Sequence, residues 1–340
     1  MTKTTIKDVA DYAGVSKATV SRVLNNYPYV ADDVRKRVHQ AMLDLGYQPN
    51  RSARRLRANS SDILGLIIPD IQNPLFQSVV RGVEDAAYEQ QMNVILCNTD
   101  DIPEKQRVYL RVMQAERAAG VLVVPTLPSD GEVLRPVQEA GTPIVLLDRD
   151  VDQFEADQVR TDNVHGAYAA VWHLTTLGYK RIAIIAGSQY LTPGHERLRG
   201  YKEALEKAAL ALDYTLIKEG NFRVESGYTL TRDLMTVPDP PDAIFVSNNL
   251  MTLGALRALH ELSIRIPQDV ALVGFDDMPW ASDLHPPLTT VAQPGYELGK
   301  TAVELLLSRI AKPTLPFRRI MLQPQLIVRQ SCGALVRPLR

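Results

Sequence analysis

Apolar side chains recur at helical spacing through the first 46 residues of the chain. The run from residue 6 to residue 13 repeats at that spacing until Gly14 ends it, which predicts a helix. After a short turn, Ser16 is placed to cap a second helix, and a third apolar stripe runs from Asp32 to Gly46. The apolar positions of the stripes are Ile6, Val9, Ala10, Ala13, Val20, Val23, Leu24, Val34, Val38, Ala41, Met42 and Leu45. The spacing predicts a helix-turn-helix within a small all-α domain.

From residue 63 onward, short apolar runs alternate with helical stretches. In the first series, expected strands cover residues 63–69, 93–98, 120–125 and 143–148, with helices over 74–91, 104–118 and 130–140. In the second series, expected strands cover 182–187, 243–247 and 270–277, with helices over 164–177, 196–212, 226–235 and 250–262. The alternation predicts an α/β fold with two similar lobes, each a doubly wound parallel sheet. Ligands of such sheets bind at the carboxyl ends of the strands, so we expect a site in a cleft between the lobes.

The composition is that of a globular protein. Of the 340 residues, 45% are hydrophobic and 23% are charged, which excludes wholesale disorder and fibrous folds. No apolar run approaches the roughly 18 residues that a membrane span needs. The residues after Met1 contain no apolar secretory core. We therefore expect a cytoplasmic protein without a membrane partner.

The charge separates into a basic N-terminal part and an acidic remainder. Residues 1–59 carry 11 Lys and Arg against 5 Asp and Glu, whereas the rest of the chain carries 27 against 34. A compact basic head suits the phosphate backbone of nucleic acid. Surface charge also serves solvation alone, so the charge by itself leaves both interpretations open.

The second helix presents a polar outward face. If its apolar stripe points inward, the residues on the opposite and flanking faces are Lys17, Ala18, Ser21, Arg22 and Asn25. In the major groove, Arg forms two hydrogen bonds with a guanine, Lys donates to base acceptors, and Ala makes apolar contact with a thymine methyl. The face therefore predicts base readout, although any surface helix has a polar side.

A short basic segment follows the third helix. Residues 47–61 read YQPNRSARRLRANSS, with four arginines around the apolar Leu56. A lone helix of about nine residues is marginal in water and needs a surface to order against. DNA supplies such a surface, because the arginines neutralise phosphates while Leu56 wedges between base steps. The alternative is a flexible basic linker with an incidental leucine.

The run from residue 6 to residue 56 resembles a known family. DVADYAGVSKATVSRVLN, GYQPN and ARRLR are similar to the DNA-binding head and hinge helix of the lactose repressor (LacI/GalR) family of bacterial transcription regulators. The resemblance implies Lys17, Ala18 and Arg22 as base readers, Ser16, Thr19, Ser21 and Asn25 mainly as backbone or groove contacts, Asn50 as a hinge contact, and Leu56 as the intercalating wedge.

The resemblance extends over nearly the whole chain. It implies a core with the fold of periplasmic sugar-binding proteins, whose chain crosses between its lobes near residues 161–163, 291–294 and 321–325. The expected domains are a head (1–46), a hinge (47–60), a first lobe (61–162 with 293–322), a second lobe (163–292 with 323–333) and a tail (334–340). The tail carries no leucine heptad, which favours a dimer over the tetramers of some relatives.

Polar residues stand at the ends of several expected strands. Carboxylates and amides that converge on one cleft suit sugar hydroxyls, a guanidinium adds a planar fork, and phenylalanines stack on a ring face. The resemblance places Phe76, Asp148, Arg197, Phe222, Asn248 and Asp276 at effector-contacting positions. Each has an alternative role: an Asp that caps a turn, a Phe in the core, or an Arg197 paired only with Glu196 or Asp162.

The sequence does not determine the chemical identity of the effector. Members of the family mostly sense sugars or sugar derivatives, and one branch senses purine bases. Leu191 stands where a purine sensor would have a polar reader, which disfavours a purine. Many relatives have Asn-Asp where this chain has Asn248 and Asn249, which puts the role of position 249 in doubt.

No catalytic motif is present in the sequence. It lacks GxxxxGK[ST] and GxGxxG loops after expected strands, an HExxH pair and a GxSxG turn. His165, His173 and His195 lie on or at the starts of expected helices, His165 and His173 have no ligand cluster at metal spacing, and Cys97 and Cys332 are not at zinc-ligand spacing. We predict reduced thiols, no metal, no cofactor and no enzymatic activity.

The sequence therefore predicts a cytoplasmic, homodimeric transcriptional regulator, which we expect to be a repressor. A carbohydrate effector bound between the lobes would change its affinity for a near-palindromic double-stranded operator. Two alternatives remain: an activator of the same family, and a free sugar-binding protein of the periplasmic type. The latter would need a signal peptide and would not need a basic head.

Overall fold

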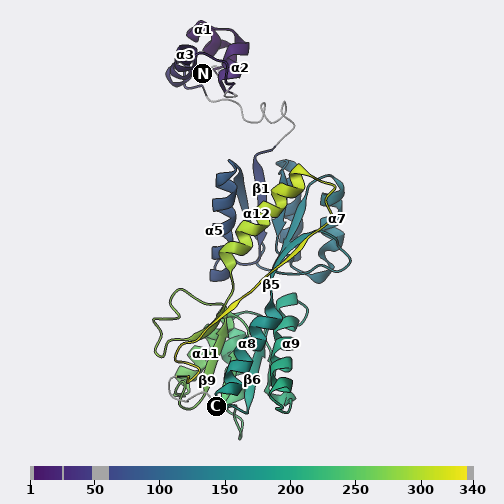
Figure 1. Cartoon of the computed structure of the whole chain (residues 1–340), viewed down its shortest axis with the longest axis vertical. Helices are drawn as coiled ribbons and strands as arrows, with labels where there is room; N and C mark the ends of the chain where they lie inside the picture. The colour runs from purple at the N-terminus through teal and green to yellow at the C-terminus, as the bar shows by residue number, and fades with distance from the viewer. Residues whose placement is uncertain (1–3, 25–26, 48–60, 335–340) are drawn as a thin grey trace. The chain divides into compact units, whose positions relative to one another are not determined.

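The computed structural model describes residues 4–24, 27–47 and 61–334 (Figure 1). It divides the chain into two compact units, residues 1–61 and residues 62–340. A finer division of the first unit into head and hinge stays a prediction, because residues 48–60 lie outside the described part.

The first unit contains the three expected helices, α1 (Ile6–Ala13), α2 (Lys17–Leu24) and α3 (Asp32–Asp44). α1 begins with a capping box: Thr5 Oγ1 accepts from the backbone N–H of Asp8, and the Asp8 carboxylate accepts from the backbone N–H of Thr5. It ends at Gly14, whose φ of +64° lies in the left-handed region that glycine tolerates. The helix-turn-helix pattern is confirmed.

The stripes expected from the sequence meet in one small core. Its fully buried members are Val9, Ala10, Ala13, Val20, Val23, Val38 and Ala41. Because these side chains occupy the inward faces of all three helices, the opposite face of α2 is left to solvent.

The second unit contains two six-stranded sheets (Figure 1). The first has the order β11-β5-β4-β3-β1-β2 and the second β12-β10-β9-β8-β6-β7. The strands of the first are β1 (Ile63–Ile68), β2 (Asn93–Asn98), β3 (Gly120–Val123), β4 (Ile144–Leu147), β5 (Asp157–Thr161) and β11 (Arg319–Leu322). Those of the second are β6 (Ile182–Ala186), β7 (Ile217–Glu219), β8 (Ala243–Val246), β9 (Ala271–Phe275), β10 (Thr289–Ala292) and β12 (Gln325–Ile327). Within the described strands all pairs are parallel except β10 with β12.

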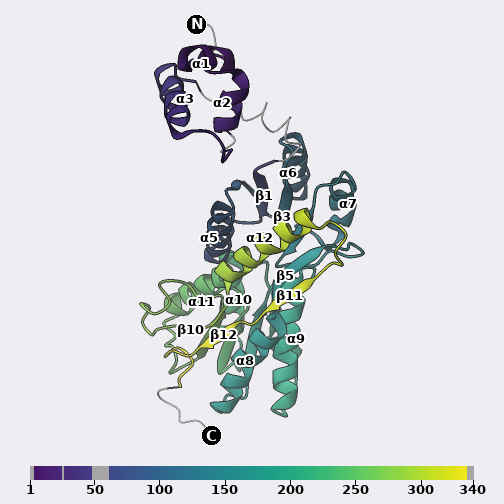
Figure 2. The same cartoon turned by 45° about the horizontal axis from the view of Figure 1, so that its top comes forward.

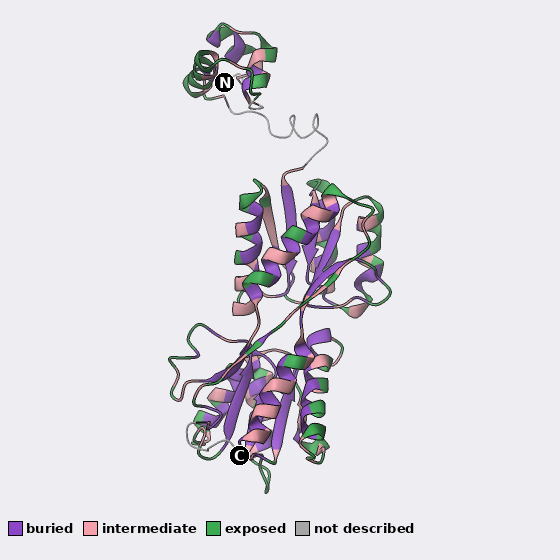
Figure 3. Ribbon diagram, in the orientation of Figure 1, coloured by how far each residue is buried: buried purple, intermediate pink, exposed green. Residues whose placement is uncertain are grey.

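Helices cover both faces of each sheet (Figure 2). In the first lobe, α5 (Pro74–Glu89) and α12 (Gly295–Ala311) cover one face, and α6 (Pro103–Ala115) and α7 (Gly131–Glu139) cover the other. In the second lobe, α8 (Asn163–Thr176) and α9 (Thr192–Lys207) lie opposite α10 (Val224–Met235) and α11 (Asn249–Glu261). Two short 3-10 turns are η1 (Pro128–Asp130) and η2 (Tyr214–Leu216). The central strands are buried on both sides, as parallel strands require (Figure 3). The expected α/β class is confirmed.

The chain passes between the two lobes three times (Figure 1). It leaves the first lobe after Thr161, returns between Ala292 and Gly295, and leaves again between Leu322 and Gln325. Because each lobe is built from separate stretches of chain, the two lobes are joined by three adjacent segments rather than by one linker.

The sequence pattern missed five strands and one helix. β5, β7, β10, β11 and β12 have only three to five residues each and no continuous apolar run. In the missed helix, α12, Gly299 lies where the helix approaches α5 closely: a Cβ at Gly299 would lie 2.2 Å from the backbone oxygen of Val79. α12 also buries Leu298, Ala302, Leu305 and Leu306 at helical spacing, so its apolar stripe is present in the sequence although no helix was expected there.

The expected helix over 196–212 was wrong at both ends. α9 begins at Thr192 with Pro193 in its first turn and ends at Lys207. Ala209 has a φ of +53°, which ends the helical path before residue 212. The earlier start places Arg197 in the second turn of the helix rather than at its beginning.

No helix in the described ranges is both long and apolar enough to cross a membrane. Cys97 and Cys332 are both buried free thiols. Burial raises the pKa of Cys97.

Candidate functional site

The outward face of α2 presents the residues expected to contact DNA. The side chains of Lys17, Ala18 and Arg22 are exposed, while Ser21 is half-buried. The three expected base readers therefore face solvent together, because their spacing of one, four and five residues keeps them on one side of the helix.

Ser16 begins α2 as expected. Its Oγ accepts from the backbone N–H of Thr19 at 3.1 Å and shares a second hydrogen bond with Thr19 Oγ1 at 2.9 Å. The two hydroxyls thus fix the start of the helix. The remaining predicted DNA contacts, Asn25, Asn50 and Leu56, lie outside the described residues.

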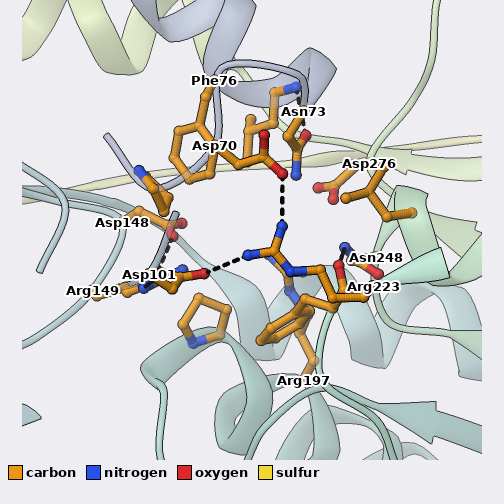
Figure 4. A pocket seen from close by; sticks show the side chains of 15 residues that line it. Asp70, Asn73, Phe76, Asp101, Asp148, Arg149, Arg197, Arg223, Asn248 and Asp276 are labelled. Carbon is orange, nitrogen blue, oxygen red and sulfur yellow. Dashed lines mark hydrogen bonds and ion pairs between the residues drawn. The ribbon is translucent and has the colours of Figure 1, made fainter. Parts of the chain in front are cut away.

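A pocket lies between the two lobes of the core (Figure 4). From the first lobe it is lined by Pro69, Asp70, Asn73, Leu75, Phe76, Asp101, Asp148 and Arg149, and from the second by Pro193, Arg197, Phe222, Arg223, Asn248, Leu250 and Asp276. All six residues expected to contact an effector, from Phe76 to Asp276, therefore line one pocket.

The carboxyl ends of the strands position most of the polar side chains. Asp70 follows β1, Asp148 follows β4, Asn248 follows β8 and Asp276 follows β9. Because parallel strands end at the same edge of a sheet, each lobe presents its polar groups toward the space between the lobes. The sheet topology, rather than any single sequence motif, therefore brings these polar side chains together in the pocket.

Four pocket residues adopt a backbone conformation that side chains other than glycine rarely adopt. Their φ angles are +58° at Asp101, +63° at Asp148, +62° at Phe222 and +73° at Asp276. Such conformations cost on the order of 1–3 kcal/mol each and cluster at functional sites. The strain supports a binding role for this pocket.

Asp148 has an unsatisfied oxygen in the pocket. Its side chain is buried, and its Oδ1 has no hydrogen-bond partner among the described residues. Burial raises the pKa of this carboxyl, and the neighbouring Arg149 and Arg197 guanidiniums only partly oppose the increase. An unsatisfied buried acceptor is costly, which makes this oxygen a candidate partner for a hydroxyl donor of a ligand.

Asp276 faces the same space with its oxygens partly occupied. The carboxylate accepts from Gln293 Nε2 and, at 3.3 Å, from the backbone N–H of Asn249. Gln293 comes from a crossing segment, so this carboxylate also connects the pocket with the connection between the lobes.

Arg197 is fixed at the base of the pocket. Its Nε donates to Asn163 Oδ1 at 2.8 Å and its Nη1 to the backbone oxygen of Ser247 at 2.6 Å. The guanidinium lies 3.8 Å from the ring centroid of Phe275. Burial lowers the pKa of this guanidinium, and the Asp276 and Asp148 carboxylates oppose the decrease.

The alternative partners considered for Arg197 are not its partners. Glu196 pairs with Arg160 at 3.3 Å, and Asp162 caps α8 by accepting from the backbone N–H of His165. The guanidinium of Arg197 is thus held by neutral acceptors and an aromatic ring, which leaves its charge directed at the pocket.

The two phenylalanines have different surroundings. Phe76 belongs to the core beneath α5 and also lines the pocket, and its contact with an effector stays a prediction. The Phe222 ring packs on the backbone of Gly187, where a Cβ would lie 1.9 Å from the ring. Glycine at position 187 therefore makes room for the ring.

Asn248 both caps a helix and lines the pocket. Its Oδ1 accepts from the backbone N–H of Met251 at 2.9 Å, which begins α11. The next residue, Asn249, donates from Nδ2 to Asn73 Oδ1 across the lobes at 2.8 Å. The asparagine at position 249, whose role the sequence left in doubt, thus supplies a buried contact between the lobes.

Several polar residues of the pocket were not predicted from the sequence, namely Asp70, Asn73, Asp101, Arg149 and Arg223. Asp70 and Arg149 each lie just after a strand end, which is the same signal that identified Asp148. No comparable signal marks Arg223, whose partners lie in the other lobe.

The polar and aromatic groups of the pocket suit a hydroxylated ligand. Carboxylate and amide oxygens, a fixed guanidinium and two aromatic rings match the hydroxyls and apolar faces of a polyol ring. Within the described ranges, no group of three or more His, Cys, Asp or Glu residues is arranged to hold a metal ion.

Comparisons with known proteins identify the family. Residues 5–50 match the profile of bacterial regulatory proteins of the lacI family, and residues 171–332 match a periplasmic binding protein-like domain. A ribose operon repressor of Halalkalibacterium halodurans is 38% identical over 329 residues, which cover 96% of this chain and 97% of the relative. The chain belongs to the lacI family of bacterial regulatory proteins.

Other lacI-family proteins match over similar lengths. The HTH-type transcriptional repressor PurR of Vibrio atlanticus is 36% identical over 334 residues, 97% of this chain and 99% of the relative. The crystal structure of the lac repressor dimer bound to operator and the anti-inducer ONPF has a TM-score of 0.87 at 29% identity, covering 97% of this chain and 99% of that one. An Enterococcus faecium lacI-family regulator with bound ribose has a TM-score of 0.72 at 31% identity, covering 79% and 98%. The expected family resemblance is confirmed.

Proposed function

We propose that this lacI-family protein is a sequence-specific DNA-binding repressor whose operator affinity is controlled by a sugar bound between its lobes. The observation that carries the proposal is that every residue expected to contact an effector lines the same pocket. The relatives support it, since they are named as repressors of a ribose operon or as PurR, and one similar structure contains ribose.

The charges of the pocket favour an uncharged sugar. Asp101 is paired with Arg149 at 2.7 Å and Asp70 with Arg223 at 2.9 Å, so these four charges compensate one another. The other charged groups are the carboxylate of Asp148, which lies 3.8 Å from Arg149, the carboxylate of Asp276 and the guanidinium of Arg197. Two carboxylate acceptors and one guanidinium donor suit the neutral hydroxyls of a sugar. A phosphate or carboxylate on the ligand would instead meet an excess of negative charge.

The DNA-binding part of the proposal rests on α2. We assign Lys17, Ala18 and Arg22 as base readers, because they share the exposed face of that helix. A two-fold dimer of such heads requires a near-palindromic operator. The lac repressor structure, a dimer bound to operator, supports the same assembly here.

Two further parts of the proposal follow from the relatives. Because the relatives are named as repressors, we assign no enzymatic activity to this chain. We place its action in the cytoplasm, where operator DNA is found.

Binding-site selection from a random DNA pool tests the proposal. The selection is repeated with a panel of neutral sugars, sugar phosphates and purines. We expect a near-palindromic site whose enrichment falls in the presence of one neutral sugar. Enrichment that rises with a purine would instead indicate a corepressor of the kind that the name PurR suggests, and no enriched DNA would contradict the repressor assignment.

A further inference from the structure

Arg223 spans the mouth of the pocket. It lies at the start of α10 in the second lobe, next to Phe222, and both of its carboxylate partners belong to the first lobe (Figure 4). Its Nη1 pairs with Asp70 Oδ2 at 2.9 Å, and its Nη2 lies 3.5 Å from Asp101 Oδ2. One guanidinium thus contacts two carboxylates of the facing lobe.

The exposure of the pocket residues shows which end is open. Arg197, Asp148 and Asp276 are buried, with 2%, 5% and 4% of their surface exposed. The side chains of Arg223 and Asp101 are 39% and 34% exposed. The buried groups therefore form the base of the pocket, and the bridge of Arg223 with Asp70 and Asp101 lies at its solvent side.

The partners of Arg223 are held in place by other groups. Asp70 Oδ1 accepts from the backbone N–H of Gln72 at 2.9 Å, which leaves Oδ2 for Arg223. Asp101 has a positive φ and accepts from the buried Arg149 at 2.7 Å. Because both carboxylates are oriented before Arg223 meets them, little further ordering is needed to form the bridge.

The pocket that these residues line is small. The cavity has a volume of about 50 Å³. Sites for drug-sized ligands are roughly 300–1,000 Å³. A ligand with one ring would need a modest separation of the lobes, and a second ring on the solvent side of the pocket would meet the Arg223 guanidinium, which is 39% exposed.

We propose that Arg223, by bridging Asp70 and Asp101 across the mouth of the pocket, is a specificity-determining residue that limits the effector to a single sugar ring. This inference rests on the proposed function, since it concerns the size of the ligand in the same pocket. The bridge opens to admit the ligand and re-forms behind it. The Arg223 and Asp101 side chains are partly exposed, and ion pairs near the surface are weak, so opening the bridge is compatible with reversible binding.

Calorimetric titration of the full-length protein with D-ribose, D-glucose and the disaccharide cellobiose tests the size limit. We expect the unaltered protein to bind one of the monosaccharides and not cellobiose. Arg223→Ala should bind cellobiose at least tenfold more tightly than the unaltered protein, while the monosaccharide affinity falls by less than tenfold. Cellobiose binding that does not differ between the two proteins would overturn the size limit.

Two further variants separate the bridge from a general effect on folding. Asp70→Asn removes one partner charge and keeps the side-chain shape, and its effect on cellobiose should not add to that of Arg223→Ala, because both break the same bridge. Arg232→Ala is the matched control: it removes an arginine from the same helix whose ion pair, with Glu261, stays within the second lobe. We expect Arg232→Ala to match the unaltered protein, and full additivity of the first two changes would contradict a shared bridge.

Hydrogen exchange of the sugar-free protein tests the bridge independently of any ligand. The backbone N–H groups of Ile71 and Gln72 at the mouth donate to Asn98 and Asp70. They should exchange at least threefold faster in Arg223→Ala than in Arg232→Ala. Equal exchange rates in the two variants would contradict the bridge, whereas the proposed sugar effector is tested separately by the binding-site selection with the whole panel of neutral sugars.

Discussion

The DNA-binding face of α2 and the pocket between the lobes differ in how the chain builds them. The face of α2 comes from one helix of eight residues, and its side chains point to solvent. The pocket comes from segments as distant as Asp70 and Asp276, and the charged groups at its base are almost completely buried. The first surface is suited to a large partner that approaches from outside, and the second to a small ligand that is enclosed.

The difference also concerns how the charges are compensated. Lys17 and Arg22 are exposed, whereas the carboxylates and guanidiniums of the pocket lie within a network that joins the two lobes. A change on α2 should therefore have local consequences, while a change in the pocket should also alter how the lobes fit together. Mutations that separate these two behaviours test the comparison.

The largest expected effect is that of Arg197→Ala on effector affinity. The variant removes a buried guanidinium directed at the pocket, and a lost hydrogen bond to a charged group costs about 1.5–3 kcal/mol. We expect the effector affinity, measured by calorimetry, to fall by about 10- to 150-fold, since each 1.4 kcal/mol is a factor of ten. Arg199→Ala, an exposed arginine on the same helix, is the matched control. An unchanged affinity in Arg197→Ala would place the effector site elsewhere.

The next effect is that of Arg22→Ala on operator recognition. A bidentate contact with a base contributes about 1–3 kcal/mol of discrimination, so we expect a roughly 5- to 150-fold loss on the preferred operator. The loss should be concentrated on one base pair in each half-site, which fluorescence anisotropy with single-base operator variants would show. Arg37→Ala removes the same charge from an exposed position on α3 and serves as the control. Equal losses on every sequence would make Arg22 a phosphate contact instead.

A smaller effect is the pH dependence of effector binding. Burial raises the pKa of Asp148 above its ordinary value of 3.8. A sugar hydroxyl that donates to this carboxylate favours its ionised form. Affinity should therefore be full above the raised pKa and should decrease as the pH falls through it. The decrease should begin at a higher pH than an ordinary Asp would give, and Asp148→Asn should remove it. Calorimetric affinities that do not change over the acidic range in which the core stays folded would contradict this role.

The smallest expected effect is that of Thr5→Ala on the stability of the first unit. The change removes the side chain of the capping box that begins α1, which costs about 0.5–2 kcal/mol. We expect the unfolding transition of the helical head to shift, while the transition of the core, followed by calorimetry, stays in place. A shift of both transitions would show that the two units do not unfold independently.

The head was the part of the fold most readily predicted from sequence. Its helices carry their signals locally: the apolar stripe with Val20 and Val23, the Ser16 cap and the Gly14 stop all lie within a few residues. Local periodicity specifies such a domain because nearly all of its core contacts use the same repeating faces.

The core was predicted in class but not in full. The apolar strands buried on both faces were recognised, whereas α12 was not expected although Leu298, Ala302, Leu305 and Leu306 form an apolar stripe along it. Strand β5 was missed because its buried Asp157 is satisfied by Arg309, a contact between residues 152 positions apart. Pairings of that kind leave no local pattern.

The pocket was predicted from the polar residues at strand ends, with the family resemblance as a guide. Asp148 and Asp276 could be identified because each ends a strongly apolar strand. Arg223 could not, because its role depends on Asp70, 153 positions away in the other lobe. Which residues of the two lobes face each other depends on how the three crossing segments place the lobes. The sequence pattern does not show this.

The central claim is that the head and the pocket are coupled, and the most direct test is reciprocal. The dissociation constant of the effector is measured by calorimetry with and without the selected operator DNA. If the effector weakens operator binding by a given factor, the operator must weaken effector binding by the same factor, and typical couplings are about 5- to 150-fold. The account predicts such a difference, equal in both directions. Identical effector affinity in the presence and absence of operator would contradict it.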